Sequence, residues 1–169
     1  NISISNVTFR DARATAGFSG GYGLVSWNGG ANRVQLSNLT FQDIGQSDIG
    51  LFEGTDWVGH GFISDGNGYF PCNVESQGTA IIKRVSLSDW AITDAGCGAI
   101  TVIQNGTSDA ATGTVEDVTI ADVRAYNTGI GNATVGAVRL RGTKRTTLRN
   151  IAIDTCASHG LYNNAADTN

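Results

Sequence analysis

The sequence predicts an all-β chain that winds into a parallel β-helix solenoid, and three observations lead to this fold class. Gly makes up 23 of the 169 residues and Pro only one, a balance that favours short strands joined by turns. A ten-residue pattern recurs along the chain. A further short strand, introduced by Gly, follows each copy. Coils of three short strands stacked on one another account for all three observations.

The ten-residue pattern aligns without gaps in five segments. Its first, third, sixth and eighth positions are mostly apolar, which is typical of strands with one buried face. The segments are ISISNVTFRD from Ile2, VQLSNLTFQD from Val34, VSLSDWAITD from Val85, VTIADVRAYN from Val118 and TTLRNIAIDT from Thr146. We therefore expect two short strands in each segment and about five coils.

The fifth position of the pattern is Asn or Asp in every copy. Such residues tolerate a left-handed backbone, and stacked amides can hydrogen-bond along a column. The column consists of Asn6, Asn38, Asp89, Asp122 and Asn150. We interpret it as a ladder of structural turns whose side chains are turned away from solvent. Asn6 and Asn38 are therefore poor glycosylation sites, and the other two Asn-x-Ser/Thr sequons, at Asn105 and Asn132, are the candidates.

The Gly-introduced strands predict an outward-facing lane of side chains. They are GLVSW from Gly23, GLFEG from Gly50, GAITV from Gly98, GAVRL from Gly136 and GLYNN from Gly160. If the residues two and four after Gly face inward, the third faces outward, which selects Ser26, Glu53, Thr101, Arg139 and Asn163. Neighbouring rungs are about 4.8 Å apart, so Glu53 is expected roughly 10 Å from Arg139.

The second coil is about twenty residues longer than the others, and we predict a loop insertion at 55–80. Long loops on a rigid scaffold often carry binding and catalysis. The stretch VGHGFISDG within it contains His60, one of two histidines in the chain. An alternative makes Gly61-Phe62-Ile63 the third strand of this coil. Because no helix that could cap a solenoid is evident, residues 1–169 are expected to be a single β-helix segment of a longer protein.

The pattern resembles the parallel β-helix repeat of the pectin-lyase-like superfamily over nearly the whole chain. The resemblance implies right-handed coils, but that superfamily includes lyases, hydrolases, epimerases, phage spikes and adhesins. Gly59-His60-Gly61 looks like the Gly-His-Gly element of the polygalacturonase family, and Val138-Arg139-Leu140-Arg141 is similar to its Arg-Ile-Lys element. The Asn-Thr-Asp and Asp-Asp elements of that family do not occur here. The resemblance therefore implies sugar binding more directly than hydrolysis.

These patterns select the candidate site residues. Glu53, His60 and Arg139 are the catalytic candidates, and Asp48, Asp56, Trp57, Asp65 and Arg141 are the candidates for substrate binding. Hydrolysis of a glycosidic bond needs two carboxylates at a set separation. A lyase instead needs a base and a positive charge beside the uronate carboxylate. Both reactions stay open, as does a calcium ion near Asp48 and Glu53.

Charge and cysteine content narrow the expected partners. The net charge of −4 makes nucleic acid a poor partner, and no apolar run is long enough to span a membrane. The three cysteines fit no metal-binding spacing, although a bridge between Cys72 and Cys97 is conceivable. We expect an extracellular or cell-surface protein that contacts polysaccharide, with flanking coils or neighbouring subunits capping the solenoid. The alternative is a non-enzymatic stalk, spike or adhesin segment.

Overall fold

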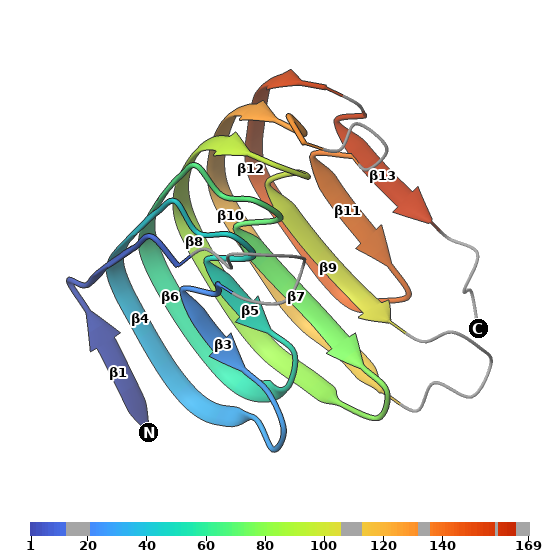
Figure 1. The fold of residues 1–169 in the computed structure, drawn as a ribbon. Coiled ribbons are helices and arrows are strands. Elements are labelled where there is room, and N and C mark those ends of the chain that lie inside the picture. The colour runs from blue at the N-terminus through green and yellow to red at the C-terminus, as the bar shows by residue number, and fades with distance from the viewer. Residues whose placement is uncertain (13–20, 106–112, 132–135, 158, 165–169) are drawn as a thin grey trace.

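The chain forms two parallel β-sheets stacked on each other (Figure 1). The computed structural model describes residues 1–12, 21–105, 113–131, 136–157 and 159–164. Those residues form strands and turns, with no helix that could cross a membrane. The long sheet consists of β1 (Ile2–Ser5), β2 (Thr8–Arg10), β4 (Ala31–Gln42), β6 (Gly54–Asp65), β8 (Ile81–Ala95), β10 (Thr114–Thr128) and β12 (Lys144–Cys156). The short sheet consists of β3 (Leu24–Ser26), β5 (Ile49–Leu51), β7 (Cys72–Gln77), β9 (Ile100–Asn105), β11 (Val138–Arg141) and β13 (Leu161–Asn164).

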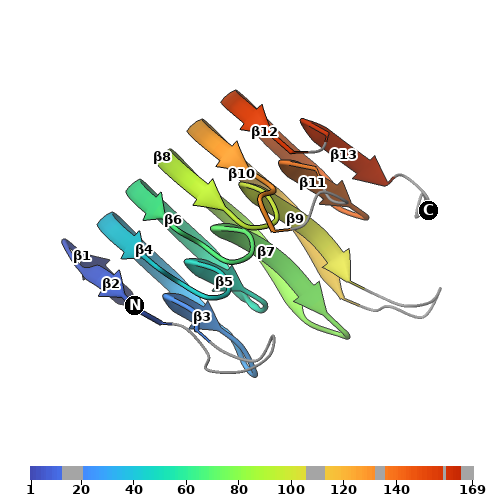
Figure 2. The same ribbon diagram turned by 45° about the horizontal axis from the view of Figure 1, so that its top comes forward.

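The chain passes alternately through the two sheets. The long sheet has the order β1-β4-β6-β8-β10-β12, with β2 also pairing with β4, and the short sheet has the order β13-β11-β9-β7-β5-β3. Each strand therefore lies beside the strand from the previous pass, and Figure 2 shows the two resulting rows. The all-β class and the stacked parallel strands agree with the sequence prediction.

Residues 55–80 do not form the predicted loop insertion. They contain β6 and β7, one strand of each sheet. In β6, Trp57 pairs with Val34 on one side and Val85 on the other, which are first positions of the ten-residue pattern. WVGHGFISDG is thus a sixth copy of the pattern. The alternative assignment of Gly61-Phe62-Ile63 as a third strand is also wrong, because β6 belongs to the long sheet.

The sixth copy escapes alignment because glycines replace two of its key residues. Gly59 occupies the inward third position, where an added Cβ would lie 2.6 Å from Cζ of Phe62. Gly61 occupies the turn column with a φ of 73°. A Cβ there would lie 2.7 Å from Oδ1 of Asn38. Close packing therefore explains both glycines around His60.

The turn ladder is present, and it is one of three. Left-handed residues recur every five positions along β4 and directly after it, at Arg33 (φ 58°), Asn38 (φ 52°) and Asp43 (φ 55°). The ladder amides also bond to one another, since Asn38 Nδ2 donates to Asn6 Oδ1 at 3.2 Å. Both side chains are exposed, however. The expectation that they turn away from solvent is wrong, because the bends lie on the outer edge of the sheet.

The core lies between the two sheets and runs along their whole length. Leu39, Phe41, Leu87 and Ile100 are fully buried within it. Aromatic rings stack from strand to strand, as where the ring centroids of Phe62 and Trp90 are 4.3 Å apart. Burial of each such large side chain contributes roughly 1.5–3 kcal/mol. The core accordingly holds the sheets as a rigid support for whatever lies on their outer faces.

Candidate binding face

The predicted site residues lie in separate parts of the molecule. Asp48, just before β5, is completely buried in the interior. Asn67 Nδ2 donates to its Oδ1 at 2.8 Å. Burial raises the pKa of Asp48 to about 6, although its polar neighbours Ser64 and Asn67 partly oppose this shift. A group at this depth acts on folding and does not meet a bound sugar.

Glu53 has a structural position at the end of the short-sheet strand β5. Its Oε2 accepts a hydrogen bond from the backbone N–H of Gly29 at 2.7 Å. Its carbonyl oxygen accepts one from Ser26 Oγ at 2.6 Å. Both bonds hold the turn between β3 and β4. The carboxylate of Glu53, which was predicted to be catalytic, therefore stabilises this turn.

The predicted outward lane is correct only in part. Thr101 pairs with Arg139, as expected. The strand next to Thr101 contributes Asn73, and the strand after that contributes Gly50, so Glu53 is not in this lane. The error arises because Gly does not occupy the same register in each strand. The expectation that Glu53 lies two rungs from Arg139 is therefore wrong, because it assumed that both residues belong to one lane.

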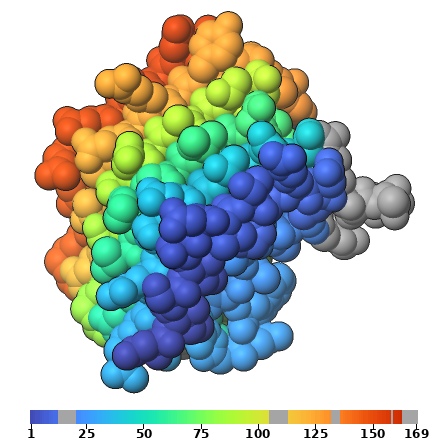
Figure 3. Space-filling model, turned by 90° about the vertical axis from the view of Figure 1, so that its left-hand side faces the viewer, coloured from blue at the N-terminus to red at the C-terminus, as the bar shows by residue number. Residues whose placement is uncertain are grey.

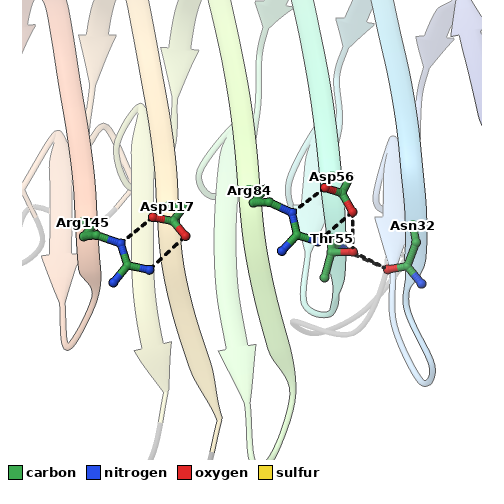
Figure 4. A network of polar contacts seen from close by, with 6 residues as sticks. All are labelled: Asn32, Thr55, Asp56, Arg84, Asp117 and Arg145. Carbon is green, nitrogen blue, oxygen red and sulfur yellow. Dashed lines mark hydrogen bonds and ion pairs between the residues drawn. The ribbon is translucent and has the colours of Figure 1, made fainter.

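Asp56 and Trp57 are also occupied by structural contacts. Trp57 is 4% exposed in the core, and its indole Nε1 donates to the carbonyl oxygen of Ala31 at 2.8 Å. Arg84 holds both carboxylate oxygens of Asp56, with Nε 2.5 Å from Oδ1 and Nη2 2.9 Å from Oδ2 (Figure 4). Hydrogen bonds from Arg84 lower the pKa of Asp56 to about 2. Neither residue is available to a sugar.

Asp56 belongs to a column of alternating charge that sequence reasoning missed. Its members each have a left-handed backbone and precede the first position of a pattern copy. They are Arg33, Asp56, Arg84, Asp117 and Arg145. Arg145 donates hydrogen bonds to Asp117 as Arg84 does to Asp56, and Arg145 Nε lies 2.5 Å from Asp117 Oδ1 (Figure 4). We call this column the charge ladder. Comparing the residue before each copy would have revealed it.

His60 and Asp65 lie on the exposed outer face of the long sheet. His60 is on β6 between Ser37 and Ser88 of the neighbouring strands. His60 thus lies on a strand and not in the predicted loop insertion. Neither Glu53 nor Arg139 shares this face, so the three catalytic candidates do not meet.

The outer face of the short sheet carries a lane of polar side chains on three neighbouring strands. Asn73 on β7 pairs with Thr101 on β9, which pairs with Arg139 on β11. Asn73 and Thr101 are each only 1% exposed. Within the described part of the chain, Asn73 Oδ1, Thr101 Oγ1 and Arg139 Nε are buried without a hydrogen-bond partner. We call these three residues the polar lane.

A second lane beside it adds charge. Glu75 on β7 and Arg141 on β11 both pair with Ile103 on the strand between them. Glu75 is 8% exposed, so its carboxylate is held close to the protein. The sequence analysis selected Arg139 and Arg141 but missed Glu75 and Asn73, because both lay in the segment assigned to a loop.

Two tyrosines border this surface. Burial raises the pKa of both Tyr22 and Tyr69, and the negative charge of Glu75 raises them further. Arg139 acts in the opposite direction on Tyr69, which places that phenol near both charged groups. The Tyr22 ring lies over Gly50, where an added Cβ would be 3.0 Å away. We call the polar lane, Glu75, Arg141 and these two tyrosines the binding face.

The binding face combines two guanidinium groups on one strand with buried polar atoms that lack a partner among the described residues. A buried polar atom without a partner costs roughly 1–3 kcal/mol, so such atoms usually have a ligand or water to bond. Guanidinium groups form paired hydrogen bonds with carboxylates. Hydroxyl groups of a sugar can donate to Asn73 Oδ1 and accept from Thr101 Oγ1. The arrangement suits a ligand rich in hydroxyls that also carries negative charge.

The long sheet has a shallow depression of about 660 Å³ on its outer surface. Arg124, Tyr126 and Asp154 lie around it on β10 and β12. Tyr126 is 53% exposed, and its neighbours Arg124 and Asp154 are also exposed. Because water already reaches these groups, this surface makes a weaker case for a ligand than the binding face does.

The remaining predictions concern a metal, a disulfide and glycans. The described residues include no group of three or more His, Cys, Asp or Glu side chains that could hold a metal, so calcium near Asp48 and Glu53 stays a prediction without support from geometry. Cys72 and Cys97 are both free and buried, so the conceivable bridge is not formed. Cys72 faces the core, where burial raises the pKa of its thiol. Asn105 ends β9, and Asn132 lies outside the described residues.

Comparison with known proteins identifies no relative. No family model matches the chain, and neither does a curated protein or a solved structure. The likeness to the pectin-lyase-like repeat therefore rests on the residues of the repeat.

Proposed function

We propose that this chain is an extracellular or cell-surface module that binds an acidic polysaccharide on the binding face. We further propose that its fold is a right-handed parallel β-helix of the pectin-lyase-like type. The alternation of strands between two parallel sheets supports this, because each pass through both sheets then makes one coil. On this reading the described strands form six coils instead of about five.

The polar lane is the observation that carries the proposed function. Three neighbouring strands each present a buried polar atom without a partner, at Asn73 Oδ1, Thr101 Oγ1 and Arg139 Nε. One such atom could reflect local packing. Three in one lane, spaced at about 4.8 Å, match an elongated ligand whose polar groups repeat along its length. Because Asn73 and Thr101 are buried, such a ligand reaches them only when the side chains that cover them move aside.

The charges on the binding face favour a uronate over a neutral sugar. Arg139 and Arg141 project from the same strand, two residues apart, and therefore from the same side of the sheet. Their guanidinium groups can pair with a carboxylate in a planar arrangement that a neutral hydroxyl cannot reproduce. Tyr22 and Tyr69 supply flat apolar surfaces against which a sugar ring can pack.

If the module is catalytic, the groups on this face fit elimination better than hydrolysis. Glu75 is the one carboxylate in the two outward lanes among the described residues. Hydrolysis by the usual route needs two. Elimination needs the uronate carboxylate to be neutralised and its α-proton to be removed by a base. Arg139 and Arg141 are suited to the first task. Flanking coils of a longer chain could supply further groups.

The binding experiment compares a uronate oligosaccharide with a neutral hexose oligosaccharide of equal length. Isothermal titration calorimetry should show binding of the uronate only. Arg139→Gln should weaken it about tenfold or more, since a charge-assisted hydrogen bond contributes roughly 1.5–3 kcal/mol. Arg124→Gln is the matched control, because Arg124 lies on the long sheet of the same pass. Equal binding of both sugars, or equal effects of both variants, would contradict the proposal.

A second readout separates binding from catalysis. Elimination creates a conjugated unsaturated uronate at the new chain end, which absorbs in the ultraviolet. Growth of this absorbance with the original chain, and its loss in Arg139→Gln, would identify a lyase. Binding without product would identify a recognition module. This second result favours the alternative in which the chain is a stalk or adhesin segment.

A further inference from the structure

The turn ladder on the outer edge of the long sheet contains a sequon that the fold leaves open to solvent. Asn38-Leu39-Thr40 is an Asn-x-Thr sequence, which is the acceptor motif for N-glycosylation. Asn38 is exposed, Leu39 is fully buried and Thr40 is half-buried. Figure 3 shows that successive layers of the chain, from blue to red, each reach the surface of the molecule. A position in the ladder therefore does not exclude a glycan, contrary to the expectation from sequence.

We propose that Asn38 is an N-glycosylation site, with the glycan attached to Nδ2. The inference rests on the extracellular or cell-surface location proposed above, because N-glycans are found on exported proteins. Asn6 also begins a sequon, but only one neighbour of its side chain in the ladder is described, so the inference concerns Asn38 alone. Asn38 has a described neighbour on each side, which are Asn6 and Gly61.

The two neighbours in the ladder fix the orientation of the Asn38 amide. Its Nδ2 donates to Asn6 Oδ1 on the preceding strand at 3.2 Å. Its Oδ1 lies on the opposite side, over Gly61 on the following strand, where an added Cβ would be 2.7 Å away. The N–H and the C=O thus point in opposite directions along the ladder, as they do in a trans peptide group. Asn150 also donates to the preceding strand, since its Nδ2 lies 2.7 Å from Asp122 Oδ1.

A glycan can replace one amide hydrogen of Asn38 without breaking the ladder bond. Nδ2 carries two hydrogens, and attachment of a sugar leaves a secondary amide with a single N–H. Secondary amides strongly prefer the trans form, in which this N–H points away from the C=O. The retained hydrogen is therefore the one that faces Asn6. The sugar takes the place of the other hydrogen, which continues the direction of the side chain away from the backbone.

The attachment is a group transfer from a lipid-linked oligosaccharyl diphosphate, catalysed by the transferase of the secretory pathway. A bond forms between Asn38 Nδ2 and C1 of the first sugar, and the bond between C1 and the phosphate oxygen breaks. The lipid diphosphate leaves with the bonding electrons, and Nδ2 loses one proton. The amide carbonyl is unchanged, so Oδ1 stays over Gly61.

The strand that follows Asn38 leaves room for the first sugar. Its residue in the ladder is Gly61, which has no side chain. The next side chain in the column is Asp89 on β8, two rungs or roughly 10 Å from Asn38. This position belongs to the long sheet, whereas the binding face belongs to the short sheet. A glycan on Asn38 therefore grows from a different sheet and leaves the binding face uncovered.

Expression of the original chain through the secretory pathway of a eukaryotic cell tests the site. Glycopeptide mass spectrometry of the secreted, folded protein should find a glycan on most copies of Asn38. Thr40→Val is the matched variant, because it removes the sequon and leaves the Asn38 amide and its ladder bond in place. It should be secreted without this glycan. An Asn38 that carries no sugar in the secreted protein would overturn the proposal.

Hydrogen exchange of the Asn38 side chain tests the orientation of the glycan. In the glycosylated chain, the single Nδ2–H should exchange about tenfold more slowly than in a glycosylated peptide of the same sequence, because it donates to Asn6 Oδ1. Asn6→Asp keeps an acceptor oxygen and should retain this protection, whereas Asn6→Ala should lose it. Both variants also remove the sequon of Asn6. Equal protection in the two variants would show that the N–H points elsewhere and would overturn the proposal.

New sequons compare a ladder position with a buried one. Ala152→Thr makes Asn150 an acceptor, and its amide donates to the preceding strand as that of Asn38 does. Glu75→Thr makes Asn73 an acceptor, although Asn73 is only 1% exposed. The first variant should be secreted with a glycan on Asn150, whereas no secreted, folded chain of the second should carry one on Asn73. Exclusion of the glycan from Asn150 as well would overturn the proposal. None of these measurements depends on uronate binding, so the two proposals fail separately.

Discussion

The two sheets differ in how the polar groups on their outer faces find partners. On the long sheet, side chains bond to one another along columns, as Asp56 does with Arg84 and Asn38 with Asn6. On the short sheet, each residue of the polar lane has one buried atom without a partner among the described residues, namely Asn73 Oδ1, Thr101 Oγ1 and Arg139 Nε. The first arrangement stabilises the fold by itself. The second is left incomplete, which is expected of a surface that binds something else.

Two aspartates, Asp56 and Asp48, show the same difference between a side chain with a charged partner and a buried side chain. Asp56 on the long sheet is exposed and held by a guanidinium, which lowers its pKa to about 2. Asp48, directly before β5 of the short sheet, is buried, which raises its pKa to about 6. The charged form is favoured at one position and disfavoured at the other. Their effects on stability should therefore have opposite dependence on pH.

The largest predicted effect concerns Asp48 and pH. Its pKa is about 6 in the folded chain and about 3.8 when unfolded, so the folded chain holds an extra proton between these values. The contribution of Asp48 to the unfolding free energy is therefore most favourable below pH 3.8. It falls by about 3 kcal/mol as pH rises through 6. Asp48→Asn should remove this loss, because an amide can accept the same hydrogen bond from Asn67 and carries no charge.

Urea denaturation of both chains at pH 4 and pH 7 measures this effect. The difference in unfolding free energy between Asp48→Asn and the original chain should grow by about 2 kcal/mol between these two pH values, since part of the loss has already occurred at pH 4. Asp65→Asn serves as the control, since Asp65 is an exposed carboxylate on β6, the next strand along the chain. A difference that does not change with pH would show that folding leaves the pKa of Asp48 unchanged.

The contrast also shows which parts of the structure could be predicted from sequence. The turn ladder was predictable because a left-handed bend favours Asn, Asp or Gly, and five copies visibly have Asn or Asp there. The charge ladder uses the same bend but fills it with arginine and aspartate. Its signal is the alternation of charge between copies, which no single copy reveals.

The binding face was harder to predict for a physical reason. Gly59 and Gly61 make room for the Phe62 ring and the Asn38 amide, so the sixth copy lost the residues by which the others align. Without β7, Asn73 and Glu75 had no place in the sheet. The outward register was then counted from glycines that do not align, as Gly50 pairs with Val25 and not with Gly23. In β5, β7 and β9, two buried apolar residues flank one outward residue, as Cys72 and Val74 flank Asn73. Counting the register from those buried residues would have placed the lane correctly.

A smaller effect is expected where the turn ladder is interrupted on the long sheet. Asn38→Ala places a residue with a Cβ and no amide at a φ of 52°. The loss of the ladder bond and the left-handed strain should cost about 1–2 kcal/mol. Asn38→Gly should cost less, because glycine relieves the strain, as Gly61 does in β6. Urea midpoints measure both. Equal losses would show that the hydrogen bond contributes and the backbone strain does not.

The smallest predicted effect is a change in unfolding free energy that has opposite sign on the two sheets. Thr101→Val removes a buried hydroxyl without a partner and leaves the shape almost unchanged, so it should stabilise the chain by about 1 kcal/mol. Thr55→Val on the long sheet removes a hydroxyl that contacts Asn32 Oδ1 at 3.0 Å and Asp56 Oδ2 at 2.9 Å, so it should destabilise by a similar amount. The two variants are chemically identical, and only the environment of the hydroxyl differs.

Combining this stability measurement with uronate binding tests whether the polar lane is kept for a ligand. Thr101→Val should lose affinity while gaining stability, whereas Thr55→Val should keep its affinity while losing stability. A loss of affinity together with a gain of stability is expected when a buried polar atom contributes to binding and destabilises the fold. If Thr101→Val is destabilised as Thr55→Val is, the hydroxyl has a structural partner such as bound water. The polar lane would then be part of the fold, and the difference between the two sheets would disappear.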